Sequence, residues 1–321
     1  MTIDIQLRNL LEHASASGVP DMADVPFPVA REIYSAILAS GDLPVADVDI
    51  TERRIDGPDG ALTLRLYRPR TAGGKRGAVF YSHGGGFCLG RPQDYDGVCS
   101  TLCLEADCVV VQCDYRLAPE HPFPAAVDDS WAALNWLAAH AESLGADPAR
   151  LIVAGDSAGA NLAAVLALLA RAQGGPALRQ QTLIYPVVTT VPGQFESARR
   201  FGEGYTLTNR LIERISSAYV NNPRHLDDWR AGPLLAADLS ALPPALLMVA
   251  GFDPLRDEGI AYADKLADAG TQVSLIDYPG LAHGFISMGG AITAARLAVS
   301  QVATAWRLAF AQGTQQETPA S

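Results

Sequence analysis

A strand-like run that ends in a Gly-x-Ser-x-Gly turn constrains this chain more than any other feature. Residues 151–154 are apolar and partly β-branched, and the turn Gly155-Asp156-Ser157-Ala158-Gly159 follows them directly. The apolar run 162–170 then has the length of a helix. A strand, sharp turn and helix place Ser157 at the apex, beside N–H groups that have no partner inside the helix. The alternative is an ordinary glycine-rich turn whose serine caps the helix, and the pentapeptide alone does not exclude it.

Composition excludes several classes of protein. The 321 residues suit one large α/β domain with an insertion, or two domains. Hydrophobic residues make up 49% of the chain and charged residues 18%, so a large core can form. The formal net charge of −11 argues against nucleic acid and anionic membrane surfaces as partners. No apolar run reaches the roughly 18 residues that a membrane-spanning helix needs, so we expect no stable membrane association.

The N-terminal residues and the cysteines predict a reducing compartment. Residues 1–17 include Asp4 and Glu12 and lack a continuous apolar core, which favours an amphipathic helix over a secretory signal. The cysteines are odd in number, and four of them lie close together: Cys99, Cys103, Cys108 and Cys113. They contain no Cys-x-x-Cys pair and no histidine lies among them, so we expect no metal site. Reduced thiols favour the cytoplasm.

Strand-like and helix-like segments alternate along most of the chain. Two strand-like segments, 48–55 and 62–67, flank a Gly-Pro-Asp-Gly turn, and the second alternates with period two, so the pair predicts a hairpin. Further strands are expected at 78–81, 108–113, 151–154, 182–188, 245–250 and 273–278, with helices between them. This alternation predicts a mostly parallel sheet with helices on both faces and an antiparallel edge at the hairpin.

Two stretches, residues 1–46 and 189–222, lack strand signals and have helical spacing of apolar residues. They are far apart in sequence, but both could lie over the carboxyl ends of the strands. We therefore expect a helical cap made of 1–46 and 189–222, and an α/β core made of 47–188 and 223–321.

A serine nucleophile needs a base within hydrogen-bond reach and an acid that orients the base. Asp253 follows the expected strand 245–250, and His283 follows the expected strand 273–278 and lies between glycines. The other five histidines precede this position. Asp257 and Glu258 are alternative acids, but they fall in the first turn of the next helix, where the helix dipole already favours an acid. Ser157, Asp253 and His283 are therefore the candidate catalytic residues.

A glycine run offers donors for the oxyanion that forms when a serine attacks a carbonyl group. His83-Gly84-Gly85-Gly86 directly follows an expected strand, and its backbone can approach a ligand without side chains in the way. Ala158, one residue past the serine, adds another N–H group. The expected oxyanion hole is Gly84, Gly85, Gly86 and Ala158, and the candidate pocket residues are Phe87, Cys88 and Asp156.

Five motifs occur in one order along the chain. They are His-Gly-Gly-Gly-Phe at 83–87, Asp-Tyr-Arg-Leu-Ala-Pro-Glu at 114–120, Gly-Asp-Ser-Ala-Gly at 155–159, Asp-Pro-Leu-Arg-Asp-Glu at 253–258 and His-Gly-Phe at 283–285. In order and spacing they resemble the bacterial hormone-sensitive-lipase-like esterases, also called family IV, of the α/β-hydrolase fold. The form of the serine motif is similar to that of the larger of the family's two subgroups.

The resemblance implies a carboxylic ester hydrolase that needs no cofactor. It implies Ser157 as nucleophile, His283 as base and then acid, and Asp253 as the orienting acid. It also implies small esters of short to medium acyl chains as substrates and, as in many members, a homodimer through the last strand. An amidase or a lactone hydrolase on the same triad stays an alternative. So does a ligand-binding protein on a hydrolase scaffold, although such proteins typically lose the histidine.

Overall fold

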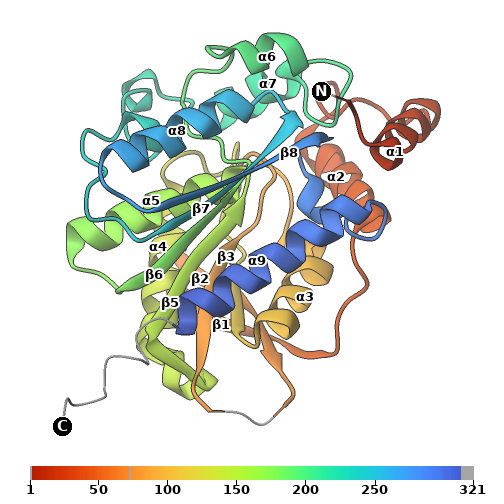
Figure 1. Ribbon diagram of the computed structural model, residues 1–321. Coiled ribbons are helices and arrows are strands. Elements are labelled where there is room, and N and C mark those ends of the chain that lie inside the picture. Colours follow the sequence, from red (N-terminus) through yellow and green to blue (C-terminus); the bar gives the residue numbers. More distant parts are fainter. Residues whose placement is uncertain (1, 72–73, 312–321) are drawn as a thin grey trace, which may run out of the picture.

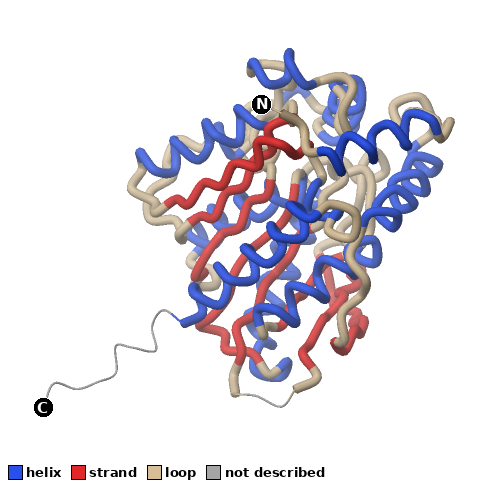
Figure 2. The backbone as a smooth tube through the Cα atoms, turned by 45° about the vertical axis from the view of Figure 1, so that its right-hand side comes forward, coloured by secondary structure: helices blue, strands red, loops and turns tan. Residues whose placement is uncertain are grey.

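The computed structural model describes residues 2–71 and 74–311, and its centre is one eight-stranded sheet with helices on both faces (Figures 1 and 2). The strands are β1 Val48–Gly57, β2 Gly60–Pro69, β3 Arg76–Ser82, β4 Val109–Cys113, β5 Ala146–Asp156, β6 Leu178–Ile184, β7 Ala245–Phe252 and β8 Val273–Ala282. The longer helices are α1 Ile5–Ala16, α2 Phe27–Gly41, α3 Asp96–Ala106, α4 Ala125–His140, α5 Ala158–Gln173, α6 Glu196–Phe201, α7 Asn209–Tyr219, α8 Arg256–Asp268 and α9 Thr293–Ala311.

The strand order is β1-β2-β4-β3-β5-β6-β7-β8. β2 pairs antiparallel with β1 and with β4, and every other neighbouring pair is parallel. The expected hairpin forms with Gly57 opposite Gly60. The predicted fold class, a mostly parallel sheet with an antiparallel edge and helices on both faces, is therefore confirmed.

One expected strand is displaced. The segment predicted at 182–188 lies at Leu178–Ile184 instead. Pro186 has no N–H group to donate to a neighbouring strand, so the ladder ends before it. β8 extends to Ala282, further than expected, and thereby brings the chain directly to His283.

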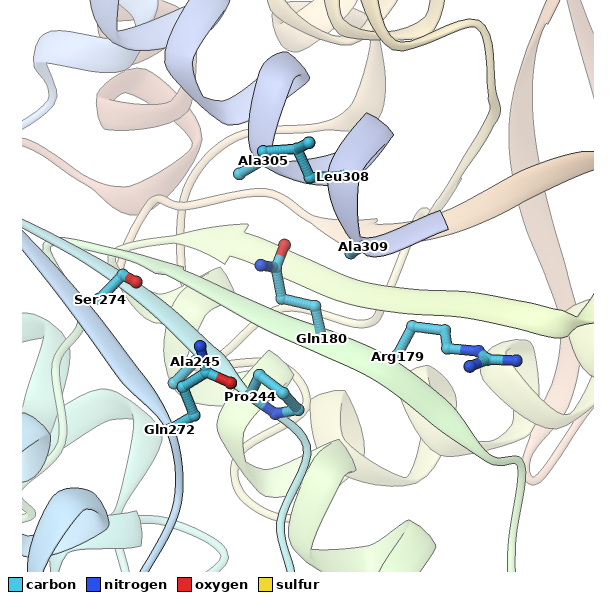
Figure 3. Close-up of a pocket in the computed structure, with 9 residues that line it drawn as sticks. All are labelled: Arg179, Gln180, Pro244, Ala245, Gln272, Ser274, Ala305, Leu308 and Ala309. Carbon is cyan, nitrogen blue, oxygen red and sulfur yellow. The ribbon is translucent and has the colours of Figure 1, made fainter. Parts of the chain in front are cut away.

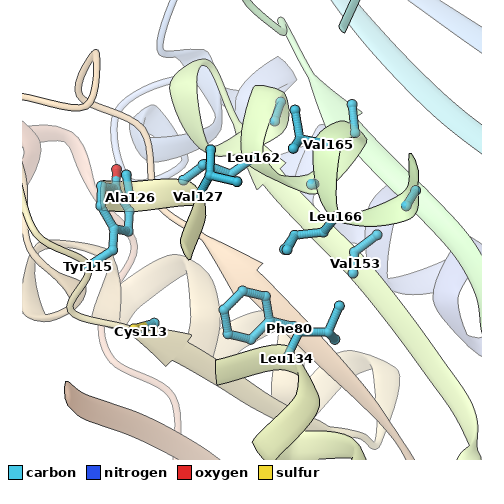
Figure 4. Packing of buried hydrophobic residues seen from close by; sticks show 14 of the residues in the cluster. Phe80, Cys113, Tyr115, Ala126, Val127, Leu134, Val153, Leu162, Val165 and Leu166 are labelled. Carbon is cyan, nitrogen blue, oxygen red and sulfur yellow. The ribbon is translucent and has the colours of Figure 1, made fainter. Parts of the chain in front are cut away.

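Alternate residues of the central strands pack into two separate apolar cores, one on each face of the sheet. Phe80 of β3 and Val153 of β5 pack with α4 and α5, as Figure 4 shows. Their sequence neighbours Val79 and Ile152 pack on the opposite face, with α3 and α9. Side chains of a strand point alternately to the two faces of a sheet, so a strand covered on both faces must be apolar throughout. This explains the continuous apolar runs in the sequence.

The two stretches without strands meet near the carboxyl ends of the strands. Leu207, Leu211 and Ile212 form a small apolar cluster with Leu255, and Met22 and Ala23 of the N-terminal stretch pack against it. In Figure 1, α6 and α7 lie at the top of the molecule, above the end of β7.

Two arginines of α7 add polar contacts between these stretches. Arg210 forms ion pairs with Asp21 and Asp24. Arg214 donates to the carbonyl of Met22, and its guanidinium lies 4.3 Å from the centre of the Phe27 ring. The N-terminal stretch and α7 are therefore joined by apolar, ionic and cation–π contacts.

No helix within residues 2–71 and 74–311 combines the length and the apolar character that a bilayer crossing requires. All five cysteines are buried and unpaired.

Candidate active site

Ser157 lies in a turn between β5 and α5 that two glycines make possible. Its backbone has φ +56° and ψ −117°, a strained conformation for a residue that carries a Cβ. A Cβ on Gly159 would lie 1.9 Å from the carbonyl oxygen of Ser82, and one on Gly155 would lie 2.3 Å from that of Gly159. The ends of β3 and β5 and the start of α5 can approach this closely only because both positions are glycine.

Ser157, His283 and Asp253 form a chain of hydrogen bonds. His283 Nε2 lies 2.9 Å from Ser157 Oγ, and His283 Nδ1 lies 2.8 Å from Asp253 Oδ2. The second oxygen of Asp253 accepts a bond from the N–H group of Leu255 at 2.8 Å. An ionised carboxylate only accepts hydrogen bonds, so Nδ1 carries the proton of a neutral ring and Nε2 is free to accept the serine proton.

His283 is held from two sides, at its ring and at its backbone carbonyl. The ring of Tyr185 lies 4.6 Å from the His283 ring, centre to centre. The hydroxyl of Thr206, in the segment before α7, donates to the His283 carbonyl at 2.7 Å. The histidine is therefore fixed by the core beneath it and by the strandless stretch above it.

The alternative acids have other partners. Asp257 accepts a hydrogen bond from the N–H group of Ser197 at 2.9 Å, and Glu258 accepts one from that of Val188 at 2.7 Å. Burial, with a smaller contribution from the charge of Asp253, raises the pKa of Glu258 to about 8. Of the three acids, the structure brings Asp253 to His283.

The glycine loop differs from expectation at Gly84. Its N–H group donates to the Tyr95 hydroxyl at 3.1 Å and to the Asp156 carboxylate at 3.0 Å, so it is not available to an oxyanion. Within the described residues, the N–H groups of Gly85 and Gly86 donate to no other protein atom. Both glycines have positive φ, +106° and +61°. Of the four N–H groups expected to donate to an oxyanion, those of Gly85, Gly86 and Ala158 therefore remain candidates.

Asp156 was expected in the pocket, and the structure places its carboxylate beneath the glycine loop instead. Besides the N–H group of Gly84, the carboxylate accepts hydrogen bonds from the hydroxyls of Tyr81 at 3.1 Å and Tyr95 at 3.3 Å. Asp156 is almost fully buried, and burial raises its pKa to about 6. At neutral pH the ionised carboxylate thus holds the loop from below.

Phe87 and Cys88 join the same loop to α7. Phe87 has φ +60°, and its ring stacks on the Tyr219 ring at 3.7 Å between centres. Cys88 is fully buried, with its Sγ 3.8 Å from the carbonyl oxygen of Ile215, and burial raises its thiol pKa to about 12. The protonated Cys88 thiol is therefore a packing group at neutral pH.

Several residues that support this loop were not among the candidate site residues. The Tyr115 hydroxyl donates to the His83 carbonyl at 2.9 Å, and the two rings stack at 4.4 Å. Burial lowers the pKa of His83 to about 4, so its ring is neutral at pH 7. Tyr115 belongs to the 114–120 motif and could have been suspected from it. Tyr81 and Tyr95 carry no signal of their own, because only the fold brings them to Asp156.

A surface cavity of about 200 Å³ lies elsewhere, at the amino ends of β6, β7 and β8 (Figure 3). Its lining residues are Arg179, Gln180, Pro244, Ala245, Gln272, Ser274, Ala305, Leu308 and Ala309. Ser157, Asp253 and His283 follow the carboxyl ends of parallel strands, where ligands bind in open sheets of this kind. The cavity and the hydrogen-bonded chain are thus at opposite ends of the sheet.

Comparison with known proteins gives consistent matches. The model of the family Abhydrolase_3, described as α/β hydrolase fold, matches residues 79–287. Carboxylic ester hydrolase LipN of Mycobacterium tuberculosis is 44% identical over 295 residues, which are 89% of this chain and 78% of that protein. Ethyl acetate hydrolase of Pseudomonas putida is 40% identical, with 82% of each chain covered. The solved structure of a hyperthermophilic esterase from the archaeon Pyrobaculum calidifontis is 39% identical and superposes with a TM-score of 0.90, covering 97% of this chain and all of that one.

The geometry predicts that removal of the Asp253 carboxylate lowers the reactivity of Ser157 as a nucleophile. Asp253→Asn keeps the size of the side chain but removes the acceptor for Nδ1–H, which favours the wrong tautomer of His283. The same change in a known serine triad lowers turnover by about 10⁴-fold, so we expect a large fall in the rate at which an organophosphonate labels Ser157. Asp257→Asn, the matched control, should label at close to the rate of the unchanged protein, because the Asp257 carboxylate binds the N–H group of Ser197 and not His283. The opposite ranking of the two variants would show that Asp253 is not the orienting acid.

Proposed function

The chain belongs to the α/β-hydrolase family whose model covers residues 79–287, and on that premise we propose that it hydrolyses carboxylic esters through an acyl-enzyme on Ser157. The relatives at 40–44% identity are named as carboxylic ester hydrolases and esterases. The protein is accordingly a carboxylic ester hydrolase. The observation that supports the mechanism most directly is the unbroken chain of hydrogen bonds from Asp253 through His283 to Ser157.

Acylation follows from this chain. Ser157 Oγ attacks the ester carbonyl carbon while His283 Nε2 takes the serine proton. The carbonyl oxygen becomes an oxyanion and accepts hydrogen bonds from the N–H groups of Gly85, Gly86 and Ala158, which are fixed in place before the reaction. The buried Asp253 carboxylate stabilises the imidazolium. When the intermediate collapses, His283 returns the proton to the leaving alcohol.

Deacylation repeats these steps with water. His283 removes a proton from a water molecule, whose oxygen attacks the acyl carbon of the ester on Ser157. The second oxyanion uses the same donors. Its collapse releases the carboxylic acid and returns the proton from His283 to Ser157 Oγ. Apart from the ester and water, the proposed cycle uses only groups of this chain and calls for no cofactor.

We also propose that residues 1–46 and 189–222 form a cap over Ser157, with 47–188 and 223–321 as the core. The contacts of Arg210, Arg214 and the Leu207 cluster with residues 21–27 support this division. So does α7, because a Cβ on Gly86 would lie 2.2 Å from Ile215 Cδ1. Such a cap gives a closed pocket in which the acyl chain has limited room.

The compartment and the subgroup are further proposals. The five buried, unpaired thiols support a cytoplasmic location, which fractionation of cells that produce the protein would test.

The serine motif supports membership of the larger subgroup of the hormone-sensitive-lipase-like esterases. An amidase or lactone hydrolase would use the same triad, whereas a binding protein without activity would have no use for it.

The nucleophile can be tested directly. Ser157→Ala should reduce hydrolysis of p-nitrophenyl acetate by at least about 10⁴-fold, because no other group can form the acyl-enzyme. The unfolding temperature should stay nearly unchanged, since only one hydroxyl is removed. An organophosphonate should add once to the unchanged protein, at Ser157, by mass spectrometry of peptides. Retained activity in Ser157→Ala would disprove the mechanism.

The closed pocket predicts an optimum in acyl length. Each methylene buried in the pocket can contribute up to about 0.8 kcal/mol, or roughly fourfold in kcat/KM. Once the pocket is full, a further methylene must strain the wall at a cost of about 1–3 kcal/mol. On p-nitrophenyl esters, kcat/KM should therefore rise from acetate, peak at a short to medium acyl chain and then fall. A preference for emulsified long-chain triglycerides would contradict a closed pocket.

The free edge of the sheet supports a homodimer. Within the described part of the chain β8 pairs with no strand other than β7, although the Gly280 carbonyl near its end accepts a bond from the N–H group of Asp4. Leu275, closer to its start, is 42% exposed. An exposed strand edge is a ready template for pairing with another strand. Sedimentation at micromolar concentration should give a dimer, and Leu275→Asp should shift it to monomer without loss of fold. A monomeric unchanged protein would refute this assembly.

A further inference from the structure

Arg31 is the arginine of α2, and its guanidinium contacts both the glycine loop and the 114–120 motif. Its Nε donates to the carbonyl of Cys88 at 2.8 Å, and its Nη2 donates to the carbonyl of Ala118 at 3.0 Å. Both terminal nitrogens also donate to the carboxylate of Glu120, at 3.0 and 2.6 Å. About a quarter of the side chain is exposed. One guanidinium thus connects the N-terminal stretch to two segments of the core.

The carbonyl that Arg31 holds belongs to the turn that aims the oxyanion donors. The N–H groups of Cys88 and Leu89 both donate to the carbonyl of Gly85, at 3.1 and 2.8 Å, and so close a tight turn around Gly86. The carbonyl of Phe87 accepts a bond from the N–H group of Ala118 at 2.9 Å. Two successive carbonyls of the turn, those of Phe87 and Cys88, are therefore fixed from outside it.

We propose that Arg31 is a positioning residue for catalysis, which holds the Gly85–Gly86 turn in the orientation that stabilises the oxyanion. The inference rests on the proposed function, since it needs Gly85 and Gly86 as oxyanion donors. It gives α2 a part in the chemistry beyond covering the pocket. Residues of the 114–120 motif would then all help to hold the glycine loop. Tyr115 bonds to His83, Ala118 bonds to Phe87, and Glu120 orients Arg31.

The geometry requires an arginine. Three acceptors, two carbonyls and one carboxylate, lie around one planar group, and a guanidinium offers five N–H donors in a fixed fork. A lysine ammonium can reach some of these acceptors but cannot address them all in that plane. The ion pair itself contributes little, because half of the Glu120 side chain is exposed to solvent. The value of the contact lies in fixing the position of the loop.

The test separates positioning from mere structural support. In Arg31→Ala the loop keeps its other bonds but loses the hold on the Cys88 carbonyl. Displacement of reacting groups by about 1 Å can cost on the order of 10²-fold, so kcat on p-nitrophenyl acetate should fall by about 10- to 100-fold. KM should change by less than about threefold, because the ester in the ground state does not need these donors. Inhibition by a trifluoromethyl ketone, which forms an oxyanion on Ser157, should weaken by the same factor as kcat.

Arg171→Ala is a matched control. The Arg171 side chain is exposed to nearly the same extent, and it also donates to two backbone carbonyls, those of Asp238 and Ser240, besides pairing with the Asp238 carboxylate. It lies in the last turn of α5, at the other end of that helix from Ser157. Removal of either arginine should therefore lower the unfolding temperature. In Arg171→Ala, however, kcat should stay within about twofold of the unchanged protein, whereas in Arg31→Ala it should fall.

Chemical rescue completes the design. Guanidinium chloride at tens of millimolar should restore part of kcat in Arg31→Ala, and sodium chloride at the same concentration should not. Arg31→Lys should fall between the unchanged protein and Arg31→Ala. A kcat for Arg31→Ala equal to that of Arg171→Ala, or a loss confined to KM, would overturn the proposal. Ser157→Ala, measured in parallel, keeps the two hypotheses apart. Activity in that variant would refute the acyl-enzyme, whereas an inactive Ser157→Ala together with an unchanged kcat in Arg31→Ala would refute the role of Arg31 alone.

Discussion

The structure depends on the contact between the first turn of α5 and the end of β3. Gly159 lies so close to the carbonyls of Ser82 and His83 that no side chain fits between them. This contact forms the sharp turn at Ser157. The same residues of β3 lead directly into the glycine loop, so the contact that exposes the serine also brings Gly85 and Gly86 beside it. The proposed nucleophile and the proposed oxyanion donors are thus positioned by one close approach between two segments of backbone.

Beneath this contact lies a group of buried polar residues that satisfy one another. The Asp156 carboxylate accepts bonds from Gly84, Tyr81 and Tyr95, and the Tyr95 hydroxyl also lies 3.0 Å from that of Tyr34 in α2. A buried donor or acceptor without a partner costs about 1–3 kcal/mol, so each member of such a group fixes the others. The glycine loop is flexible by sequence, yet it is held rigidly from below by this network and from outside by its bonds to residues 31 and 118.

The N-terminal stretch reaches the site by two routes. Through Met22, Ala23 and the partners of Arg210 it packs on α7, which in turn lies against Gly86 and Phe87. Through Arg31 it bonds directly to the loop that carries the proposed oxyanion donors. In the proposed mechanism, substrate access and oxyanion stabilisation therefore depend on the same two helices, α2 and α7.

The sequence by itself determined the fold class, the hairpin edge and the positions of Ser157, Asp253 and His283, each directly after a parallel strand. Period-two and helical spacings are local properties of the chain, and a strand buried on both faces must be apolar, so these features can be read without a structure. Tertiary structure decided the rest. Whether the N–H group of Gly84 is free depends on a tyrosine 11 residues away and an aspartate 72 residues away. The hold of Arg31 on Cys88 joins residues 57 positions apart through a carbonyl oxygen that every residue type possesses. Such hydrogen bonds leave no pattern in the sequence, because they form only when the sheet has brought distant segments together.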